Sequence, residues 1–320
     1  MSKQQPKISL DRARTILRDY SQALEVLAEN TAKSVVRVGP QDGWGWRGGG
    51  TGFVAGPDGL VATADHVVRR SRNLKVSFME GKSYEAKVVG RDAFTDVAVL
   101  KVDAPDLNRL EFGDSDHLKL GELVLAVSNP RGMQPSVTAG IVAGLGRPFQ
   151  GWWGRTIDNT IISDIALYPG ASGGPLVDSE GQVVGLNIAT FPPARSISVP
   201  ASTVKNVVDQ IVKDGKVRRA YLGISGQPLE LPTRTAQRAS LSQEMGVMLF
   251  SVEEDSPADK AGLVIGDILV GFNSKPIEDL DDLHKLLTPD LIGKPLELSV
   301  LRGGQVTKLR IEPVELGNQP

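Results

Sequence analysis

The feature that most constrains the fold is a series of short β-rich runs between turn residues, which extends from about residue 32 to about residue 207. These runs cover residues 34–38, 51–54, 60–62, 74–78, 86–89, 97–102, 123–127, 160–163 and 183–188. Many short strands, in a chain with 35 Gly, 20 Pro and only 5% aromatic residues, predict a sandwich or closed barrel rather than repeated βαβ units.

Helical patterns flank this β-rich region. Residues 9–29 carry apolar residues at spacings of three and four behind Ser9, an expected N-cap, and predict one amphipathic helix. Its stripe includes Leu10, Ile16, Leu17, Tyr20 and Leu24. The stripe needs a covering surface, which is either the chain's own barrel or another subunit. A second helix is expected over residues 201–212, and the polar, basic residues 213–219 after it are typical of a domain boundary.

The remainder of the chain, from about residue 220 to residue 314, has a mixed α and β pattern. Strands are expected at residues 246–252, 268–272 and 296–301. A short helix should follow Ser256, because Pro257 stands at the first helical position and Asp259 lies three residues after the cap. A second helix is expected over residues 280–287. A segment of roughly 95 residues with this pattern has the size of a small binding module.

Composition excludes several classes of function. The 320 residues suggest about two domains, and 36 basic against 38 acidic residues leave a net charge of −2, which gives no field that favours nucleic acid or an anionic membrane. With 0 Cys, disulfides, thiol nucleophiles and thiolate metal sites are ruled out. With only 3 His, no metal centre and no cofactor are expected, and a histidine base must be His66, His117 or His284.

The sequence also carries an expectation about compartment. It contains no apolar stretch of the ~18–20 residues that a membrane helix needs, and its N-terminus lacks the apolar core of a signal peptide. As written, the protein is expected to be cytoplasmic, without an integral membrane segment. If a leader has been removed, the expected compartment is periplasmic or otherwise extracytoplasmic.

Three segments supply residues for nucleophilic catalysis. In chain order they place His66 in Thr-Ala-Asp-His-Val-Val, Asp96 in Phe-Thr-Asp-Val-Ala-Val-Leu, and Ser172 in Pro-Gly-Ala-Ser-Gly-Gly-Pro. A serine hydroxyl needs a base within hydrogen-bond reach, and the base needs a carboxylate that orients it. Each residue alone could be a structural histidine, a turn acid or a loop serine, but together they favour a Ser-His-Asp site. His117 is expected to be a solvated loop residue, and Asp65 a surface or strand-end acid.

These segments resemble the chymotrypsin-fold serine proteases, and within them the HtrA (DegP/DegS-like) family. The resemblance extends over nearly the whole chain. Its matching stretches are residues 50–54 through 57–59 to His66, then 95–102, 113–116, 129–132, 137–142, 169–177 and 185–187. It implies a mainly β fold in which a trypsin-like double β-barrel is followed by an α+β PDZ domain. The implied boundaries are 1–30 for the N-terminal helix, 31–215 for the protease domain and 220–316 for the PDZ domain.

By this resemblance His66 is the general base, Asp96 its orienting carboxylate and Ser172 the nucleophile, with the N–H groups of Gly170 and Ser172 as the oxyanion hole. One departure concerns the residue before the nucleophile. HtrA proteins usually carry Asn there, whereas this chain has Ala171, which offers no side-chain hydrogen bond to hold the loop.

The resemblance also implies two recognition sites. The substrate pocket would be lined by Ala166, Leu167 and Ile188. Trypsin-like enzymes that cut after Arg or Lys carry an acid six residues before the nucleophile, where this chain has Ala166, so small or aliphatic residues are expected before the scissile bond. The PDZ loop that captures a C-terminal carboxylate would be Tyr221, Leu222, Gly223 and Ile224, followed by a strand to which the peptide adds. His284 would lie on the groove helix, on a solvated face.

The sequence therefore predicts an ATP-independent serine endopeptidase of the HtrA type, acting in protein quality control or regulated proteolysis. Its expected partners are unfolded or C-terminal peptide segments of proteins, and a homotrimer or higher oligomer is expected. The alternative is a peptide-binding chaperone or adaptor whose protease domain is catalytically silent.

Overall fold

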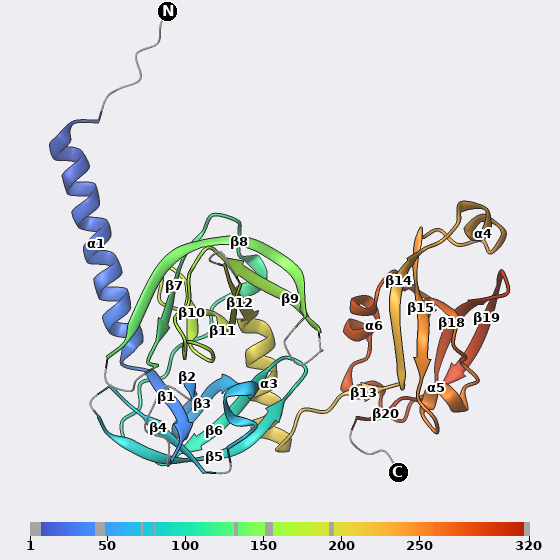
Figure 1. Cartoon of the computed structure of the whole chain (residues 1–320), viewed down its shortest axis with the longest axis horizontal. Coiled ribbons are helices and arrows are strands. Elements are labelled where there is room, and N and C mark those ends of the chain that lie inside the picture. The colour runs from blue at the N-terminus through green and yellow to red at the C-terminus, as the bar shows by residue number, and fades with distance from the viewer. Residues whose placement is uncertain are drawn as a thin grey trace, which may run out of the picture. The chain divides into compact units, whose positions relative to one another are not determined.

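The computed structural model describes residues 8–41, 49–71, 73–79, 81–130, 134–150, 156–191 and 195–316. The chain divides into two compact units, Met1–Val217 and Arg218–Pro320. The larger unit is dominated by strands and contains two closed six-stranded barrels, whereas the smaller unit is an open sheet with short helices (Figure 1). The mainly β fold class expected from the sequence is thus confirmed.

The first barrel contains six strands in the order β1-β2-β3-β6-β5-β4. Their bounds are β1 Val35–Pro40, β2 Gly50–Gly56, β3 Leu60–Ala64, β4 Leu74–Ser77, β5 Ser83–Asp92 and β6 Val97–Val102. Two short helical segments, η1 (Pro57–Gly59) and α2 (Asp65–Val68), flank β3. Alternating Val and Leu side chains of these strands fill the barrel, as their period-two pattern predicts.

The second barrel closes in the order β10-β11-β12-β9-β8-β7. Its strands are β7 Leu123–Ser128, β8 Ser136–Gln150, β9 Thr156–Ser163, β10 Pro175–Val177, β11 Val183–Phe191 and β12 Arg195–Pro200. The sequence patterns did not predict β8, β10 and β12 as strands. The register of β8 shifts three times against β9, near its glycines, and β10 has only 3 residues, so neither gives a long alternating run.

A common core joins the two barrels. One buried cluster combines Phe53 and Val97 of the first barrel with Leu125 and Leu186 of the second. The helix α3 (Ala201–Asp214) adds Val204, Val207, Val208 and Ile211 to the same cluster. Because the barrels share this core, loops that leave them on one side are held at fixed positions relative to each other.

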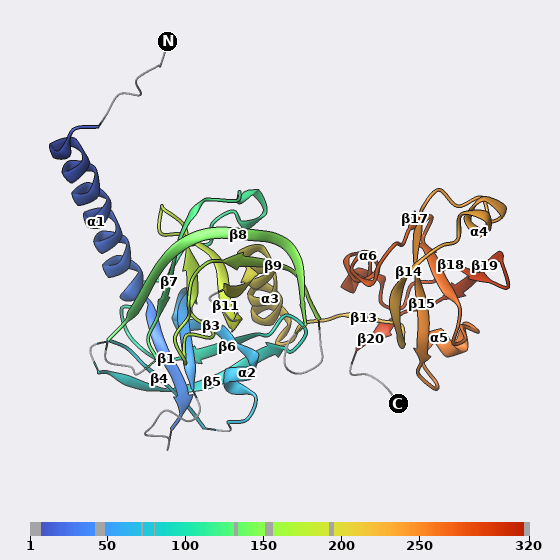
Figure 2. The ribbon, with the colours of Figure 1, turned by 45° about the horizontal axis from the view of Figure 1, so that its top comes forward.

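The N-terminal helix α1 (Leu10–Ala32) is partly covered by its own unit. As expected, Ser9 caps it by accepting a hydrogen bond from the Arg12 N–H. Leu24 and Leu27 pack against the shared core, but Leu10 and Leu17 are each 67% exposed. In both views the N-terminal part of α1 extends away from the barrels (Figure 2). The unit's own barrels thus cover only one end of the apolar stripe.

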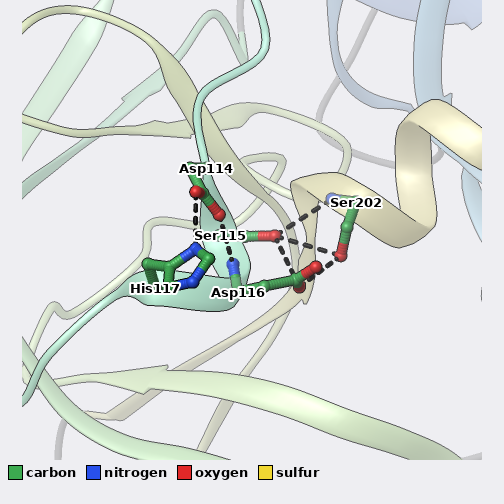
Figure 3. Close-up of polar contacts among 5 residues, drawn as sticks. All are labelled: Asp114, Ser115, Asp116, His117 and Ser202. Carbon is green, nitrogen blue, oxygen red and sulfur yellow. Dashed lines mark hydrogen bonds and ion pairs between the residues drawn. The ribbon is translucent and has the colours of Figure 1, made fainter.

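A polar cluster caps α3 from a distant loop (Figure 3). The N-cap of α3 is Pro200, which makes no side-chain cap, and Ser115 in η2 (Ser115–His117) accepts the Ser202 N–H at 3.0 Å instead. The Ser202 hydroxyl in turn donates to Asp116 at 2.8 Å. The cluster thus supplies the capping that the helix start itself lacks.

His117, at the edge of this cluster, is the solvated loop residue that the sequence indicated. Its side chain is 85% exposed, and its Nδ1 lies 2.6 Å from Asp114 Oδ2. The hydrogen bond with His117 lowers the pKa of Asp114 below its ordinary value.

The smaller unit is a sheet in the order β14-β15-β16-β18-β19, with β17 paired to β16 and a separate two-stranded sheet of β13 and β20. Its strands are β13 Ala220–Tyr221, β14 Ile224–Glu230, β15 Met245–Val252, β16 Ile268–Phe272, β17 Lys275–Pro276, β18 Leu296–Arg302, β19 Gln305–Ile311 and β20 Val314–Glu315. Its helices are α4 Thr233–Arg238, α5 Pro257–Lys260, α6 Leu280–Leu286 and η3 Pro289–Leu291. The strand β14 lies at one edge, so an added strand could pair with it.

Both helices that the sequence predicts for this unit are present. Ser256 caps α5 by accepting a hydrogen bond from the Asp259 N–H at 3.2 Å. The apolar side of α6 packs into the core of the unit, with Leu283 buried and Leu280, Leu286 and Leu287 partly buried. The side chain of His284, expected on a solvated face of this helix, lies outside the described residues.

Candidate active site

His66 and Asp96 are brought together at one end of the first barrel. His66 lies in α2, directly after β3, and Asp96 directly precedes β6, the strand paired with β3. His66 Nδ1 lies 2.6 Å from Asp96 Oδ2, and the His66 backbone N–H donates to Asp96 Oδ1 at 2.9 Å. Since an ionised carboxylate only accepts hydrogen bonds, Nδ1 carries the proton and Nε2 is left as the basic nitrogen.

The backbone at Asp96 is in the left-handed region, with φ of 56°. This costs about 1 kcal/mol for a non-glycine residue and must be held by its surroundings. The Asp96 carbonyl accepts the Asp65 N–H at 2.9 Å. Just upstream, the buried Asp92 accepts the Thr95 hydroxyl at 2.6 Å and the Phe94 N–H at 3.2 Å. These contacts fix the turn that aims the Asp96 carboxylate at His66.

Ser172 reaches the same place from the second barrel, on the loop before β10. The Ser172 carbonyl accepts the Thr51 N–H at 2.8 Å, across the junction between the barrels. A Cβ at Gly173, where φ is +88°, would lie 2.4 Å from Thr63 Oγ1 and 2.9 Å from the Ala64 nitrogen. Only glycine allows this approach to the end of β3, which leads into His66. The Ser172 hydroxyl donates to the Ile188 carbonyl at 3.2 Å.

The turn before Ser172 has the signature of type II. Pro169 and Gly170 are its central residues, Gly170 has φ of +91°, and the Ala171 N–H donates to the Tyr168 carbonyl at 3.0 Å. A type I turn would need a negative φ at Gly170, with the peptide between Pro169 and Gly170 turned over. The positive φ therefore defines the direction of the Gly170 N–H.

The loop uses most of its backbone groups. The Gly170 carbonyl accepts the Thr51 hydroxyl, the Ala171 carbonyl accepts the Gly174 N–H, and the Gly173 N–H donates to the Asn187 carbonyl. Within the described part of the chain, the N–H groups of Gly170 and Ser172 have no acceptor. Backbone N–H groups are rarely left in this state, and such a pair can bind a developing oxyanion.

Asp65 differs from the surface acid that the sequence suggested. It does follow the end of β3, but the residue is only 3% exposed. Arg91 Nε lies 3.0 Å from Asp65 Oδ1, although the angle is not that of a hydrogen bond. Burial raises the pKa of Asp65. The charge of Arg91 lowers this pKa, whereas the charge of the nearby Asp96 raises it further. The surface assignment was wrong because the Asp65 partner comes from β5, 26 residues along the chain.

The three expected pocket residues have different environments. Ile188 is 2% exposed, and its carbonyl touches the Ser172 hydroxyl, so it lies beside the nucleophile. Leu167 is half-buried and packs against the core of the second barrel, whereas Ala166 is exposed. Of the three, Ile188 is the residue that a hydrogen bond among the described residues joins to Ser172.

Two residues that sequence analysis did not single out help to build the site. Thr51 binds the Ser172 loop through both its N–H and its hydroxyl. Asn187 is fully buried, and its amide donates to the carbonyls of Gly174 and Pro175. Both lie in stretches that matched the family motif, but their partners are distant in sequence, so spacing alone did not reveal these roles.

The expected carboxylate loop of the smaller unit has a related construction. The Leu222 carbonyl accepts the Ala258 N–H and the Gly223 carbonyl accepts the Glu253 N–H, both at 2.8 Å. In the described chain, the N–H groups of Leu222 and Gly223 have no acceptor. The loop leads into the edge strand β14 through Ile224, and α6 lies next to β14. Tyr221, the first loop residue, pairs with Val314 of β20.

The described residues include no cluster of three or more His, Cys, Asp or Glu side chains able to hold a metal ion. None of the described helices combines the length and apolar character needed to cross a membrane.

Comparison with protein families identifies both units. Residues 50–186 match the model of a trypsin-like peptidase domain, and residues 220–312 match that of a PDZ domain. Two closed six-stranded barrels and this match define the class of the larger unit, a trypsin-like peptidase domain.

Relatives and solved structures narrow this class. The chain is 34% identical over 279 residues to a probable periplasmic serine endoprotease DegP-like from Chlamydia pneumoniae, covering 85% of this chain and 55% of the relative. It is 35% identical over 277 residues to the putative serine protease HhoB from Synechocystis, covering 83% of this chain and 66% of the relative. The chain spans about half to two thirds of the length of such relatives.

Among solved structures, the HtrA-type protease AlgW with tripeptide superposes with a TM-score of 0.80 at 28% identity, covering 94% of this chain and 97% of that one. The serine endoprotease from Yersinia pestis gives a TM-score of 0.73 at 28% identity, covering 93% and 98%. This chain belongs to the HtrA family of trypsin-like proteases that carry a PDZ domain, as the sequence motifs predicted.

Proposed function

We propose that the protein is an ATP-independent serine endopeptidase of the HtrA type. The observation that carries this proposal is the hydrogen bond between His66 Nδ1 and Asp96 Oδ2 on one barrel. A loop of the other barrel holds Ser172 there, with two N–H groups, those of Gly170 and Ser172, that have no acceptor in the described chain. His66 then removes the proton of Ser172, Asp96 stabilises the imidazolium, and Gly170 and Ser172 bind the oxyanion.

Several findings support an active peptidase over a silent chaperone or adaptor. His66, Asp96 and Ser172 are all present, and the positive φ of Gly170 matches the turn that directs its N–H towards a substrate carbonyl. Relatives and structural neighbours are named as proteases. The corresponding domain boundaries are residues 31–215 for the protease domain and 220–316 for the PDZ domain, with residues 1–30 as the N-terminal helix.

A fluorophosphonate probe tests this proposal directly, because it reacts only with an activated serine. The wild-type protein should be labelled at Ser172, and Ser172→Ala and His66→Ala should abolish labelling. Ser240, a serine in the smaller unit with φ of 55°, provides a matched control: Ser240→Ala should label like wild type. A folded wild-type protein that stays unlabelled and hydrolyses no peptide would support the silent adaptor instead.

The proposed substrate preference is for small or aliphatic residues before the scissile bond. Ala166 offers no carboxylate for Arg or Lys, and Leu167 and Ile188 are apolar. Cleavage of a peptide library should therefore concentrate after Ala, Val, Ile and similar residues. A profile dominated by Arg or Lys would contradict this assignment of the pocket.

The proposed ligand of the PDZ domain is the free C-terminus of a protein or peptide. Leu222 and Gly223 would supply N–H donors for the carboxylate, and the peptide would pair with the edge of β14. Unfolded proteins and their C-terminal segments are thus the proposed substrates, in protein quality control or regulated proteolysis.

We also propose a homotrimer or higher oligomer in which the exposed part of α1 packs against another copy. Leu10, Ile16 and Leu17 are at least half exposed, while Leu24 and Leu27 pack on the chain's own core. Light scattering of a protein lacking residues 1–22 would test this, because the packed end of α1 remains. A truncated protein with the oligomer mass of the full chain would exclude α1 as the assembly element.

The proposed compartment is extracytoplasmic. The DegP-like relatives are described as periplasmic, which favours this alternative over the cytoplasm. Fractionation of the source cells, with activity followed in the periplasmic extract, would test it.

A further inference from the structure

Residues 169–171, directly before Ser172, have no hydrogen-bonding side chain to hold the loop. Gly170 has only hydrogen at Cα, and Ala171, which is 1% exposed, has no hydrogen-bonding side chain. Glycine turns over easily, so a Pro169–Gly170 peptide without an outside anchor could rotate and point the Gly170 N–H away from a substrate. Something outside the loop must therefore select its orientation.

Thr51 of β2 is placed to do this. Its hydroxyl donates to the Gly170 carbonyl at 2.7 Å, and its backbone N–H donates to the Ser172 carbonyl at 2.8 Å. Thr51 thus holds the peptide groups that follow Gly170 and Ser172, and through them the two residues whose N–H groups form the hole. Among the described residues, no other side chain donates a hydrogen bond to the backbone of residues 168–172.

The surroundings fix the direction of the Thr51 hydroxyl. The side chain is fully buried, and its oxygen accepts the Asn129 N–H at 3.1 Å, so its single proton is directed to the Gly170 carbonyl. The next residue, Pro130, backs the loop, because a Cβ at Gly170 would lie 2.8 Å from the Pro130 Cβ. Gly170 is therefore held between Thr51 and Pro130.

We propose that the Thr51 hydroxyl is the positioning group of the oxyanion hole, acting through the Gly170 carbonyl from the opposite barrel. This rests on the proposed peptidase function and adds to it the residue that keeps the N–H groups of Gly170 and Ser172 aimed at the same point. Thr51 touches neither substrate nor the reacting atoms. Its effect is to keep the hole formed before the substrate arrives.

Thr51→Val is the critical variant, since it removes the hydroxyl and keeps the shape. With a short peptide substrate, kcat should fall about 10- to 100-fold while KM changes by less than about 3-fold, because the lost interaction matters mainly in the transition state. Binding of a peptide aldehyde, whose adduct places an oxyanion in the hole, should weaken by the same factor as kcat/KM.

Two further variants separate this role from a general loss of stability. Thr51→Ser keeps the hydroxyl and should retain most of the wild-type kcat. Thr160→Val is the matched control, because the Thr160 hydroxyl also donates to a backbone carbonyl, that of Arg147, at 2.7 Å, away from the Ser172 loop. It should leave kcat unchanged. If Thr51→Val does not fold, as judged by its thermal transition, Thr51→Ala and Thr51→Ser give the same comparison.

The outcomes distinguish this inference from the proposed function. A wild-type protein that is neither labelled at Ser172 nor active contradicts the peptidase function itself. An active wild type with an equally active Thr51→Val, or with Thr51→Ser as impaired as Thr51→Val, overturns the role of the Thr51 hydroxyl alone. A drop in aldehyde affinity matched to kcat/KM, with recovery in Thr51→Ser, supports it.

Discussion

Two loops of this molecule, residues 168–174 in the barrel unit and residues 221–224 in the PDZ unit, both present N–H groups that can bind an anion. They differ in the groups that hold them in place. In each, two carbonyl groups are bonded to neighbours, those of Gly170 and Ser172 or of Leu222 and Gly223, while the N–H groups of the same residues have no acceptor among the described residues. The first loop is anchored by a side chain, Thr51, from another barrel. The second is anchored by the backbone N–H groups of Glu253 and Ala258.

The way each loop is held agrees with the anion that it would bind. A C-terminal carboxylate is present before binding, so a cradle built from backbone alone is sufficient. An oxyanion exists only during the reaction, so its donors must already be placed when the charge develops. The comparison predicts that the barrel loop depends on the Thr51 side chain in addition to backbone groups, whereas the PDZ loop depends on backbone groups alone.

The largest effect should come from the catalytic groups. Ser172→Ala or His66→Ala should lower kcat by about 10⁴- to 10⁶-fold, and the double variant should be little worse, because the two act as a unit. Steady-state hydrolysis of a peptide substrate measures this. Affinity of Ser172→Ala for a C-terminal peptide should stay at the wild-type value. Unimpaired hydrolysis by Ser172→Ala would show that residues 168–174 do not form the catalytic loop.

The second largest effect should come from a substitution in the PDZ loop that disturbs its backbone. Gly223 has φ of +85°, and a Cβ there would lie 2.2 Å from the Ser256 Cβ. Gly223→Ala should displace the loop and weaken binding of an apolar C-terminal peptide about 100-fold, measured by fluorescence anisotropy. Gly262→Ala, also at a positive φ but with open space around its Cβ, is the control. Equal losses of peptide affinity in both variants would show that the close approach of Gly223 to Ser256 does not determine binding.

A change in the ligand should have a smaller effect than a change in the loop. An amidated peptide lacks the negative charge that the N–H groups of Leu222 and Gly223 would bind, so its affinity should be about 10-fold lower than that of the free acid. Isothermal titration with both peptides checks this. Equal affinities would contradict the carboxylate cradle and leave only pairing along β14.

The smallest effects should come from two Asp–Arg pairs, one in each unit, in which a buried Asp meets a partly exposed Arg. Asp267, 1% exposed, accepts two hydrogen bonds of 2.7 Å from Arg302 and one from the Val264 N–H. Burial favours a higher pKa for Asp267, but these bonds and the Arg302 charge outweigh it, so its pKa lies below the ordinary value. Asp65 lacks such aligned bonds, and burial raises its pKa.

The two pairs should therefore have opposite effects on stability as pH changes. Asp267 stabilises the fold above pH 3.8, its ordinary pKa, and this contribution is lost as pH falls through its lowered pKa. Asp65, with a raised pKa, opposes folding increasingly as pH rises above 3.8. At pH 7, Asp267→Asn should cost about 2 kcal/mol, since Arg302 is partly exposed, and Asp65→Asn should change stability by less than about 1 kcal/mol.

Urea unfolding of both variants between pH 3 and pH 7 would measure this contrast. The difference between wild type and Asp267→Asn should shrink as the solution becomes acidic. Any gain in the free energy of unfolding of Asp65→Asn over the wild type should also vanish at low pH, where wild-type Asp65 is protonated. A large loss of stability in Asp65→Asn at pH 7 would show that its pair with Arg91 resembles the Asp267 pair after all.

Much of the architecture was predictable because its signals are local. The runs around β1 to β7, the Ser9 and Ser256 caps, and the stripe of α6 depend on residues a few positions apart. The motifs around His66, Asp96 and Ser172 were also recognisable, since each is continuous in the chain. The barrel strands β8, β10 and β12 and the PDZ strand β19 were missed, and register shifts in β8 and the shortness of β10 hide the alternation of these two.

The sequence by itself determined most of the strands and helices and which residue types are available for catalysis, because periodicity, caps and motifs act over short distances. Only the tertiary structure decided that Thr51 holds a carbonyl 119 residues away and that Asp65 is buried against Arg91. These contacts arise when two closed barrels share one core, and no local pattern specifies which loops then meet.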